Sequence, residues 1–96
     1  MVVRAVGISW FLEEDYSLAL KIMLDAHVLP RTYDTWRKKA ESQEREWKAK
    51  GFLVIRAIID PEKFPTWCAK AGLNIDAKAR TAFASEFAML QVKDTN

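Results

Sequence analysis

The segment that most constrains the fold is the apolar run from Phe52 to Ile59, which is bounded by Gly51 and by Asp60-Pro61. Its β-branched residues and its short length predict a β-strand. Successive side chains of a strand point to opposite faces, and here both alternating sets are mostly apolar. We therefore expect both faces of this strand to be covered, either by helices or by a partner chain.

The segment before this strand predicts a first strand and two helices. Residues 2–8 are rich in β-branched side chains and predict the strand. Ser9 begins the entry to a helix whose apolar residues recur at three- and four-residue spacing until Leu29-Pro30 ends it. Thr32 as N-cap and Gly51 after the last turn bound a second helix. We expect the two helices to form an antiparallel hairpin.

The segment after the central strand predicts two more helices. Asp60-Pro61 is typical of a helix start, Gly72 of a helix end, and Asp76 of a second N-cap. The expected order is β-α-α-β-α-α. We predict a mostly helical α+β protein with a small two-stranded sheet, forming one domain over residues 1–96.

The charge of the chain argues against nucleic acid or membrane partners. The formal net charge is +2, and it is spread evenly, so no basic half attracts polyanions. In the second helix Glu41, Glu44 and Glu46 lie among the cations at i,i+4 spacing, which predicts a salt-bridged, solvated face. No apolar run is long enough to cross a bilayer. The single cysteine, which allows no disulfide within the chain, predicts a cytoplasmic protein.

The chain carries no pattern of catalytic, cofactor-binding or metal-binding residues. Cys68 falls late in the third helix, where the helix dipole disfavours a thiolate, so we expect a buried structural cysteine. His27 follows the first helix and has no second histidine with which to bind a metal. Glu13, Glu14 and Asp15 suit the positive end of a helix dipole. We therefore do not expect an enzyme, a cofactor or a metal.

Three residues are the candidates for an interaction surface. Trp36 and Trp47 lie on one aromatic stripe of the second helix. Arg56 lies in the middle of the central strand. It either pairs with an acid such as Asp60 or Asp76, lies at an exposed edge, or binds an anion.

The function favoured by these patterns is a non-enzymatic protein–protein interaction module, with a second copy of the chain, as in a homodimer, among the candidate partners. It would use the aromatic stripe or the strand edges, because a two-stranded sheet leaves unpaired backbone groups along both edges. Two alternatives stay open. One is a small nucleic-acid-binding regulator that uses the second helix. The other is a small ligand-binding protein or enzyme with a pocket among Trp10, Tyr16, Trp36 and Trp67.

A set of short motifs runs along nearly the whole chain. The motifs are Ile8-Ser9-Trp10-Phe11, Asp15-Tyr16, Leu29-Pro30, Thr32-Tyr33, Trp36, Ile59-Asp60-Pro61, Phe64, Trp67-Cys68, Gly72-Leu73, Asp76, Ala79-Arg80 and Phe83-Ala84. In this arrangement the chain resembles small uncharacterised bacterial proteins. The resemblance implies a bacterial, cytoplasmic protein and implies no activity for any residue.

Overall fold

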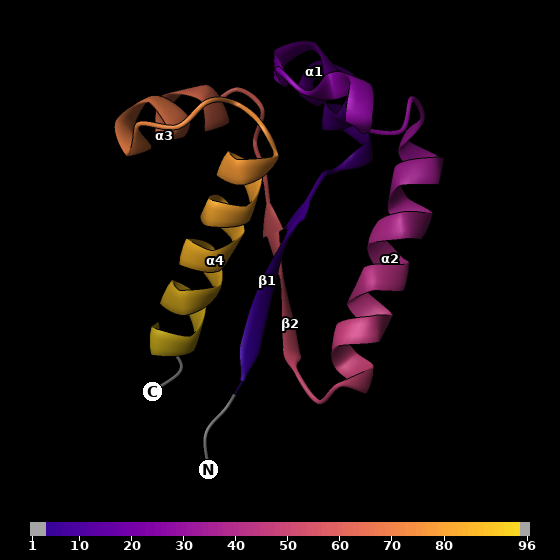
Figure 1. Ribbon diagram of the computed structural model, residues 1–96, viewed down its shortest axis with the longest axis vertical. Helices are drawn as coiled ribbons and strands as arrows, with labels where there is room; N and C mark the ends of the chain where they lie inside the picture. Colours follow the sequence, from indigo (N-terminus) through magenta and orange to yellow (C-terminus); the bar gives the residue numbers. More distant parts are fainter. Residues whose placement is uncertain (1–3, 95–96) are drawn as a thin grey trace.

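Two strands run through the middle of the molecule, and the two longest helices lie on opposite sides of them (Figure 1). The computed structural model describes residues 4–94. These residues form one compact α+β unit in the predicted order, with one short 3-10 helix added. The elements are β1 (Ala5–Trp10), α1 (Glu13–Ile22), η1 (Ala26–Val28), α2 (Tyr33–Ala49), β2 (Leu53–Ile58), α3 (Phe64–Ala71) and α4 (Ala77–Asp94).

The two strands pair in parallel, with Ala5 opposite Leu53 and Trp10 opposite Ile58. The parallel arrangement requires a long crossover between the strands, which α1 and α2 supply. The first strand was predicted over residues 2–8, of which residues 2 and 3 lie outside the described part of the chain. The predicted helix entry at Ser9 is wrong, because β1 continues to Trp10, whose carbonyl accepts a hydrogen bond from the Ile59 amide at 2.9 Å.

Helices lie on both faces of the sheet, as the apolar faces of residues 52–59 predict, but Leu53 and Ile58 at the two ends of β2 stay exposed. On one face, the ring of Trp10 meets that of Trp36 from α2 edge-on, with centroids 5.1 Å apart. On the other face, α4 packs directly against Gly7. A Cβ atom at Gly7 would lie 2.0 Å from the Ala84 carbonyl oxygen, so only glycine allows the backbone of α4 to approach β1 this closely.

The first two helices do not form the expected antiparallel hairpin. Helix α1 lies across the end of α2 instead (Figure 1). Its buried residues Tyr16 and Ala19 join the same aromatic core as Trp36. The position of α1 follows from β1, since the strand delivers the chain to that end of the sheet, where Tyr16 is buried at 3% exposure.

The C-terminal half matches the predicted pattern except at one helix start. Helix α3 begins at Phe64 rather than at Asp60, because Asp60 starts a turn in which its carbonyl accepts the Lys63 and Phe64 amides. Asp76 caps α4 as predicted, with its Oδ1 accepting the Ala79 amide at 3.2 Å. Within residues 4–94, no helix combines the length and apolar character needed to cross a membrane.

Candidate functional site

Trp36, one of the predicted interaction residues, belongs to the core. It is 7% exposed, and its ring centroid lies 5.1 Å from those of Trp10 and Phe11 and 5.4 Å from that of Tyr33. The aromatic stripe of α2 therefore packs against the body of the protein at this point. Trp36 offers little surface to a partner.

Trp47 lies at the far end of α2 and is half-buried. Phe52 contacts it edge-on with centroids 5.0 Å apart, and the Lys50 ammonium lies 5.0 Å from the centre of its ring. These contacts close the turn between α2 and β2. Trp36 and Trp47 thus do not form one exposed aromatic surface.

Arg56 forms a salt bridge, but with neither of the two predicted acids. Its Nε and Nη2 atoms donate to the two carboxylate oxygens of Glu44 at 2.7 and 2.8 Å. The guanidinium also lies 3.8 Å from the centre of the Trp10 ring. The hydrogen bonds from Arg56 hold the pKa of Glu44 below its usual range, and Glu44 raises the pKa of Arg56. This paired guanidinium is not an open anion site.

The four aromatic residues of the predicted pocket do not line one cavity. Trp10 and Tyr16 pack against Trp36, whereas Trp67 lies in a separate cluster with Phe64. A hollow of about 280 Å³ borders that second cluster. It is slightly smaller than most ligand pockets, and its polar residues are the exposed Asp60 and Lys63.

Cys68 and His27 lie in different elements and do not form a reactive pair. Cys68 is buried in α3 at 1% exposure, as predicted. Burial raises the pKa of its thiol, and the nearby charge of Asp76 raises it further. His27 is exposed in the middle of η1. In the part of the chain that the structure describes, no group of His, Cys, Asp and Glu is arranged to hold a metal ion.

The outer edge of β1 carries unpaired backbone groups. At the two ends of the ladder, the Leu53 amide donates to the Arg4 carbonyl at 2.8 Å and the Ile59 amide to the Trp10 carbonyl at 2.9 Å. Because peptide groups alternate in direction along a strand, the N–H and C=O groups of Ala5, Gly7 and Ser9 face away from β2. These groups are the candidate site. Among residues 4–94, no turn, loop or side-chain hydrogen bond involves these N–H and C=O groups.

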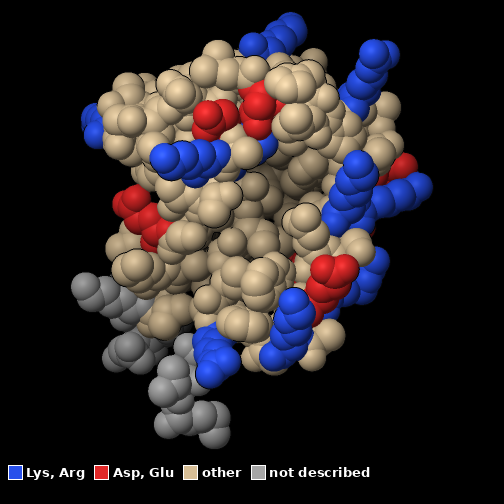
Figure 2. All heavy atoms as spheres, viewed as in Figure 1, with Lys and Arg blue, Asp and Glu red and all other residues tan. Residues whose placement is uncertain are grey.

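A groove follows this edge between α2 and α4. Its upper part has a volume of about 390 Å³ and is lined by Gly7, Ile8 and Ser9 of β1. A second hollow of about 350 Å³ lies between β1 and α4 alone, and Ala5, Val6 and Gly7 line it from the strand. Both contain Gly7, so the open edge is accessible along most of β1. β1 lies in front of β2 in the view of Figure 1, and Figure 2 shows the hollowed face of the molecule over it.

Each wall of the upper groove carries one basic residue. Trp36, Lys39 and Gln43 contribute from α2, and Ala77, Arg80 and Thr81 from α4. Among the described residues that line the groove, Lys39 and Arg80 are charged, and none is acidic. In Figure 2 most of the charged side chains on the α2 side of the hollow are basic.

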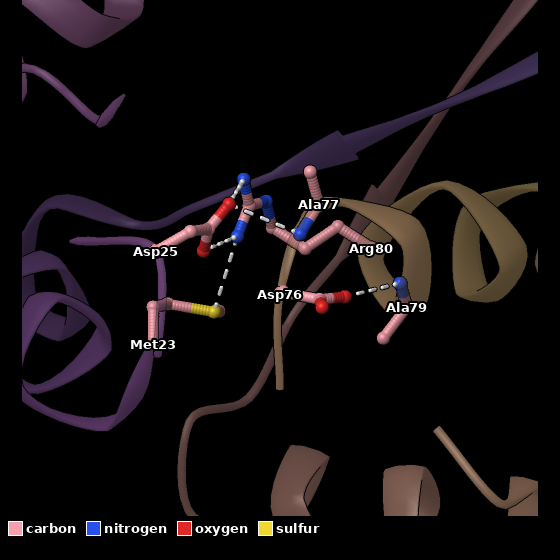
Figure 3. A network of polar contacts seen from close by, with 6 residues as sticks. All are labelled: Met23, Asp25, Asp76, Ala77, Ala79 and Arg80. Atoms are coloured by element: carbon pink, nitrogen blue, oxygen red, sulfur yellow. Dashed lines mark hydrogen bonds and ion pairs between the residues drawn. The ribbon is translucent and has the colours of Figure 1, made fainter. Parts of the chain in front are cut away.

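The charge of Arg80 is neutralised by its own salt bridge. Its guanidinium donates to both carboxylate oxygens of Asp25 at 2.8 and 2.9 Å, and to the sulfur of Met23 at 3.4 Å (Figure 3). Asp25 also accepts the Ala77 amide at 3.1 Å. Arg80 is therefore a structural part of the wall, which leaves Lys39 as the uncompensated charge.

The opposite edge of the sheet differs from the β1 edge in carrying a charged residue. Soluble proteins often place a charged residue in an edge strand to prevent pairing. β2 carries Arg56 near its centre, whereas the residues of β1 from Ala5 to Trp10 are uncharged. Of the two edges predicted to be open, the β1 edge is the one without a charged residue.

Comparison with family models, curated proteins and solved structures finds no match to this chain. The resemblance to small bacterial proteins stays a prediction. Gly7, Ser9 and Lys39 were not among the predicted interaction residues. Lys39 could have been found, because it has no acidic residue three or four positions away in α2. Ser9 was assigned to a helix entry, so the extent of the open edge could not be seen.

Proposed function

We propose that this protein is a non-enzymatic protein-binding module that receives an extended segment of a partner at the outer edge of β1. The observation that carries the proposal is the row of unpaired N–H and C=O groups of Ala5, Gly7 and Ser9 at the base of a groove. Backbone groups that lie in a recess and lack a partner are satisfied well by an added strand. Such a strand would enlarge the two-stranded sheet to three.

The groove favours a single extended segment over the edge of a second copy. The β1 edge lies between α2 and α4, and a second copy would bring its own α2 and α4 against these helices. A segment without flanking helices fits between the walls. A homodimer through this edge is accordingly the less favoured occupant. We also propose a cytoplasmic location, because one buried cysteine supports a reducing compartment.

The proposal is tested by selecting peptides from a displayed library of random decapeptides with the immobilised protein. The Ser9→Pro variant loses the N–H of residue 9, which faces away from β2, and the proline ring occupies its position. The hydrogen bonds between β1 and β2 are kept, because this N–H does not take part in them. Ser9→Ala keeps the N–H. Ile58→Pro removes an outward N–H from the opposite edge and is the matched control. Binding of selected peptides is measured by fluorescence anisotropy.

We expect the selected peptides to bind the unaltered protein, the Ser9→Ala variant and the Ile58→Pro variant with similar affinity. Their affinity for the Ser9→Pro variant should be at least about tenfold lower. Circular dichroism and a urea titration confirm that each variant is folded. Peptides that bind Ser9→Pro unchanged, or a selection without binders, would overturn the proposal. A concentration-dependent dimer that Ser9→Pro abolishes, seen by light scattering, would place a second copy at the edge and contradict the proposed occupant.

A further inference from the structure

Lys39 is the cation of α2 that has no acidic neighbour on its own helix. The positions three and four residues away from it hold Thr35, Trp36, Ser42 and Gln43. The other cations of α2 each have an acid at one of these spacings, and the salt bridges Arg37–Glu41 and Lys38–Asp34 are formed. These two bridges measure 3.7 and 3.4 Å.

The positive charge of Lys39 lies at the groove. Lys39 is exposed and lines the upper groove on the α2 side, beside the β1 edge. In the described part of the chain, no ion pair of Lys39 is formed. The second charged residue of the groove, Arg80, is neutralised by Asp25. The groove therefore has one positive charge that a bound segment could neutralise.

The strands of this protein do not supply the complementary charge. β1 has no charged residue, and the charge of β2 is the cation Arg56. A strand from a second copy would leave Lys39 unpaired or would bring a like charge into the groove, which is unfavourable. A segment with a complementary charge therefore differs from both strands of this protein, which favours another protein as its source.

Resting on the proposed function, we propose that the partner segment is acidic, with a carboxylate side chain that pairs with Lys39. Side chains of an added strand point alternately toward α2 and toward α4. The acidic residue lies in the set that points toward α2. Its carboxylate selects the partner by charge, while the hydrogen bonds of Ala5, Gly7 and Ser9 to the partner backbone hold any extended sequence.

The test uses capped, fluorescent nine-residue peptides that alternate threonine and valine. The central residue is glutamate, glutamine or lysine. A second set carries the exchanged residue one position along, so that both sides of the added strand are probed. Affinity is measured by anisotropy at low salt for the protein, for Lys39→Gln and Lys39→Glu, and for Ser9→Pro. Lys38→Gln is the matched control, since Lys38 does not line the groove and pairs with Asp34.

In one of the two sets, we expect affinity to decrease from the glutamate peptide to the glutamine peptide to the lysine peptide. The first and last should differ by about tenfold at low salt, and this difference should shrink toward about 1 M salt as screening increases. Lys39→Gln should remove the order, Lys39→Glu should reverse it, and Lys38→Gln should leave it unchanged. If Ser9→Pro weakens all peptides but Lys39 variants change no preference, the acidic partner is wrong and the proposed function stands. If no peptide shows binding that depends on Ser9, both are wrong.

Discussion

Arg80 in α4 donates two hydrogen bonds to Asp25, which lies 55 positions earlier in the chain, at 2.8 and 2.9 Å. The pair joins the segment after α1 to the start of α4, where Asp25 also accepts the Ala77 amide. Its side chains are 9% and 18% exposed. Because Arg80 also lines the groove, this pair fixes the upper end of the α4 wall.

Replacing Asp25 should destabilise the protein strongly. Asp25→Ala leaves the buried guanidinium of Arg80 without a counter-ion, and removal of one partner from a buried pair lowers the free energy of unfolding by about 3–5 kcal/mol. Urea denaturation measures the change. Asp34→Ala, which removes the exposed pair with Lys38, is the control and should cost less than about 1 kcal/mol. Equal effects of the two substitutions would show that the Asp25 pair contributes little.

The stability should fall at acidic pH because of Asp25 and Glu44. Hydrogen bonds from Arg80 and Arg56 hold the pKa values of these carboxyl groups below their usual range, which in unfolded chains is about 3.9 for Asp and 4.3 for Glu. A carboxyl group with a depressed pKa stabilises the folded protein at pH values above its pKa in the unfolded chain. This stabilisation is lost as the pH falls through its pKa in the folded protein.

The pH dependence is measured by urea denaturation between about pH 7 and pH 2.5. We expect the free energy of unfolding to decrease below about pH 4. The double variant Asp25→Asn with Glu44→Gln should be less stable at neutral pH and show a flatter decrease. An equally steep decrease in the double variant would assign the acid sensitivity to other carboxyl groups.

The approach of α4 to β1 should depend on Gly7. In Gly7→Ala the new methyl group would meet the backbone of Ala84, which cannot move without displacing α4. We expect a loss of about 3 kcal/mol or more in the free energy of unfolding, at the upper end of overpacking effects. Ser9→Ala adds no atom and should change stability by less than about 1 kcal/mol. A Gly7→Ala protein of unchanged stability would contradict the packing of α4 on β1.

Cys68 should be chemically silent in the folded protein. Its burial excludes reagents and raises the pKa of the thiol, and only the thiolate reacts readily. A thiol-specific chromogenic disulfide should react with the native protein no faster than the protein unfolds, and immediately in about 6 M guanidinium chloride. Fast reaction in native buffer would mean that α3 opens or that the thiolate is stabilised.

The sequence predicts the helices and strands well where local rules decide. Thr32 and Asp76 cap their helices by hydrogen bonds from Thr35 and Ala79, as expected of N-cap residues. The strand at residues 52–59 follows from its two apolar faces. Local rules fail at Ser9, since the strand continues through it to Trp10, whose carbonyl accepts a hydrogen bond from Ile59, a residue distant in sequence.

The candidate site was predicted only in general terms. Open strand edges follow from a sheet of two strands, but the choice of the β1 edge depends on the helices that flank it. The partners of Arg56 and Arg80 were missed for a similar reason. Glu44 comes close to Arg56 only when α2 lies over β2. Asp25 comes close to Arg80 only when α4 meets the segment after α1. No spacing along the chain encodes these contacts.

The most direct measurement is amide hydrogen exchange of β1 by NMR, with and without a selected peptide. In the free protein, the amides of Gly7 and Ser9 should exchange much faster than that of Ile8, which points toward β2. Saturating peptide should slow Gly7 and Ser9 by at least about tenfold and leave Ile8 nearly unchanged. Slow exchange at Gly7 and Ser9 without peptide, or no slowing with it, would contradict an open strand edge that receives a partner.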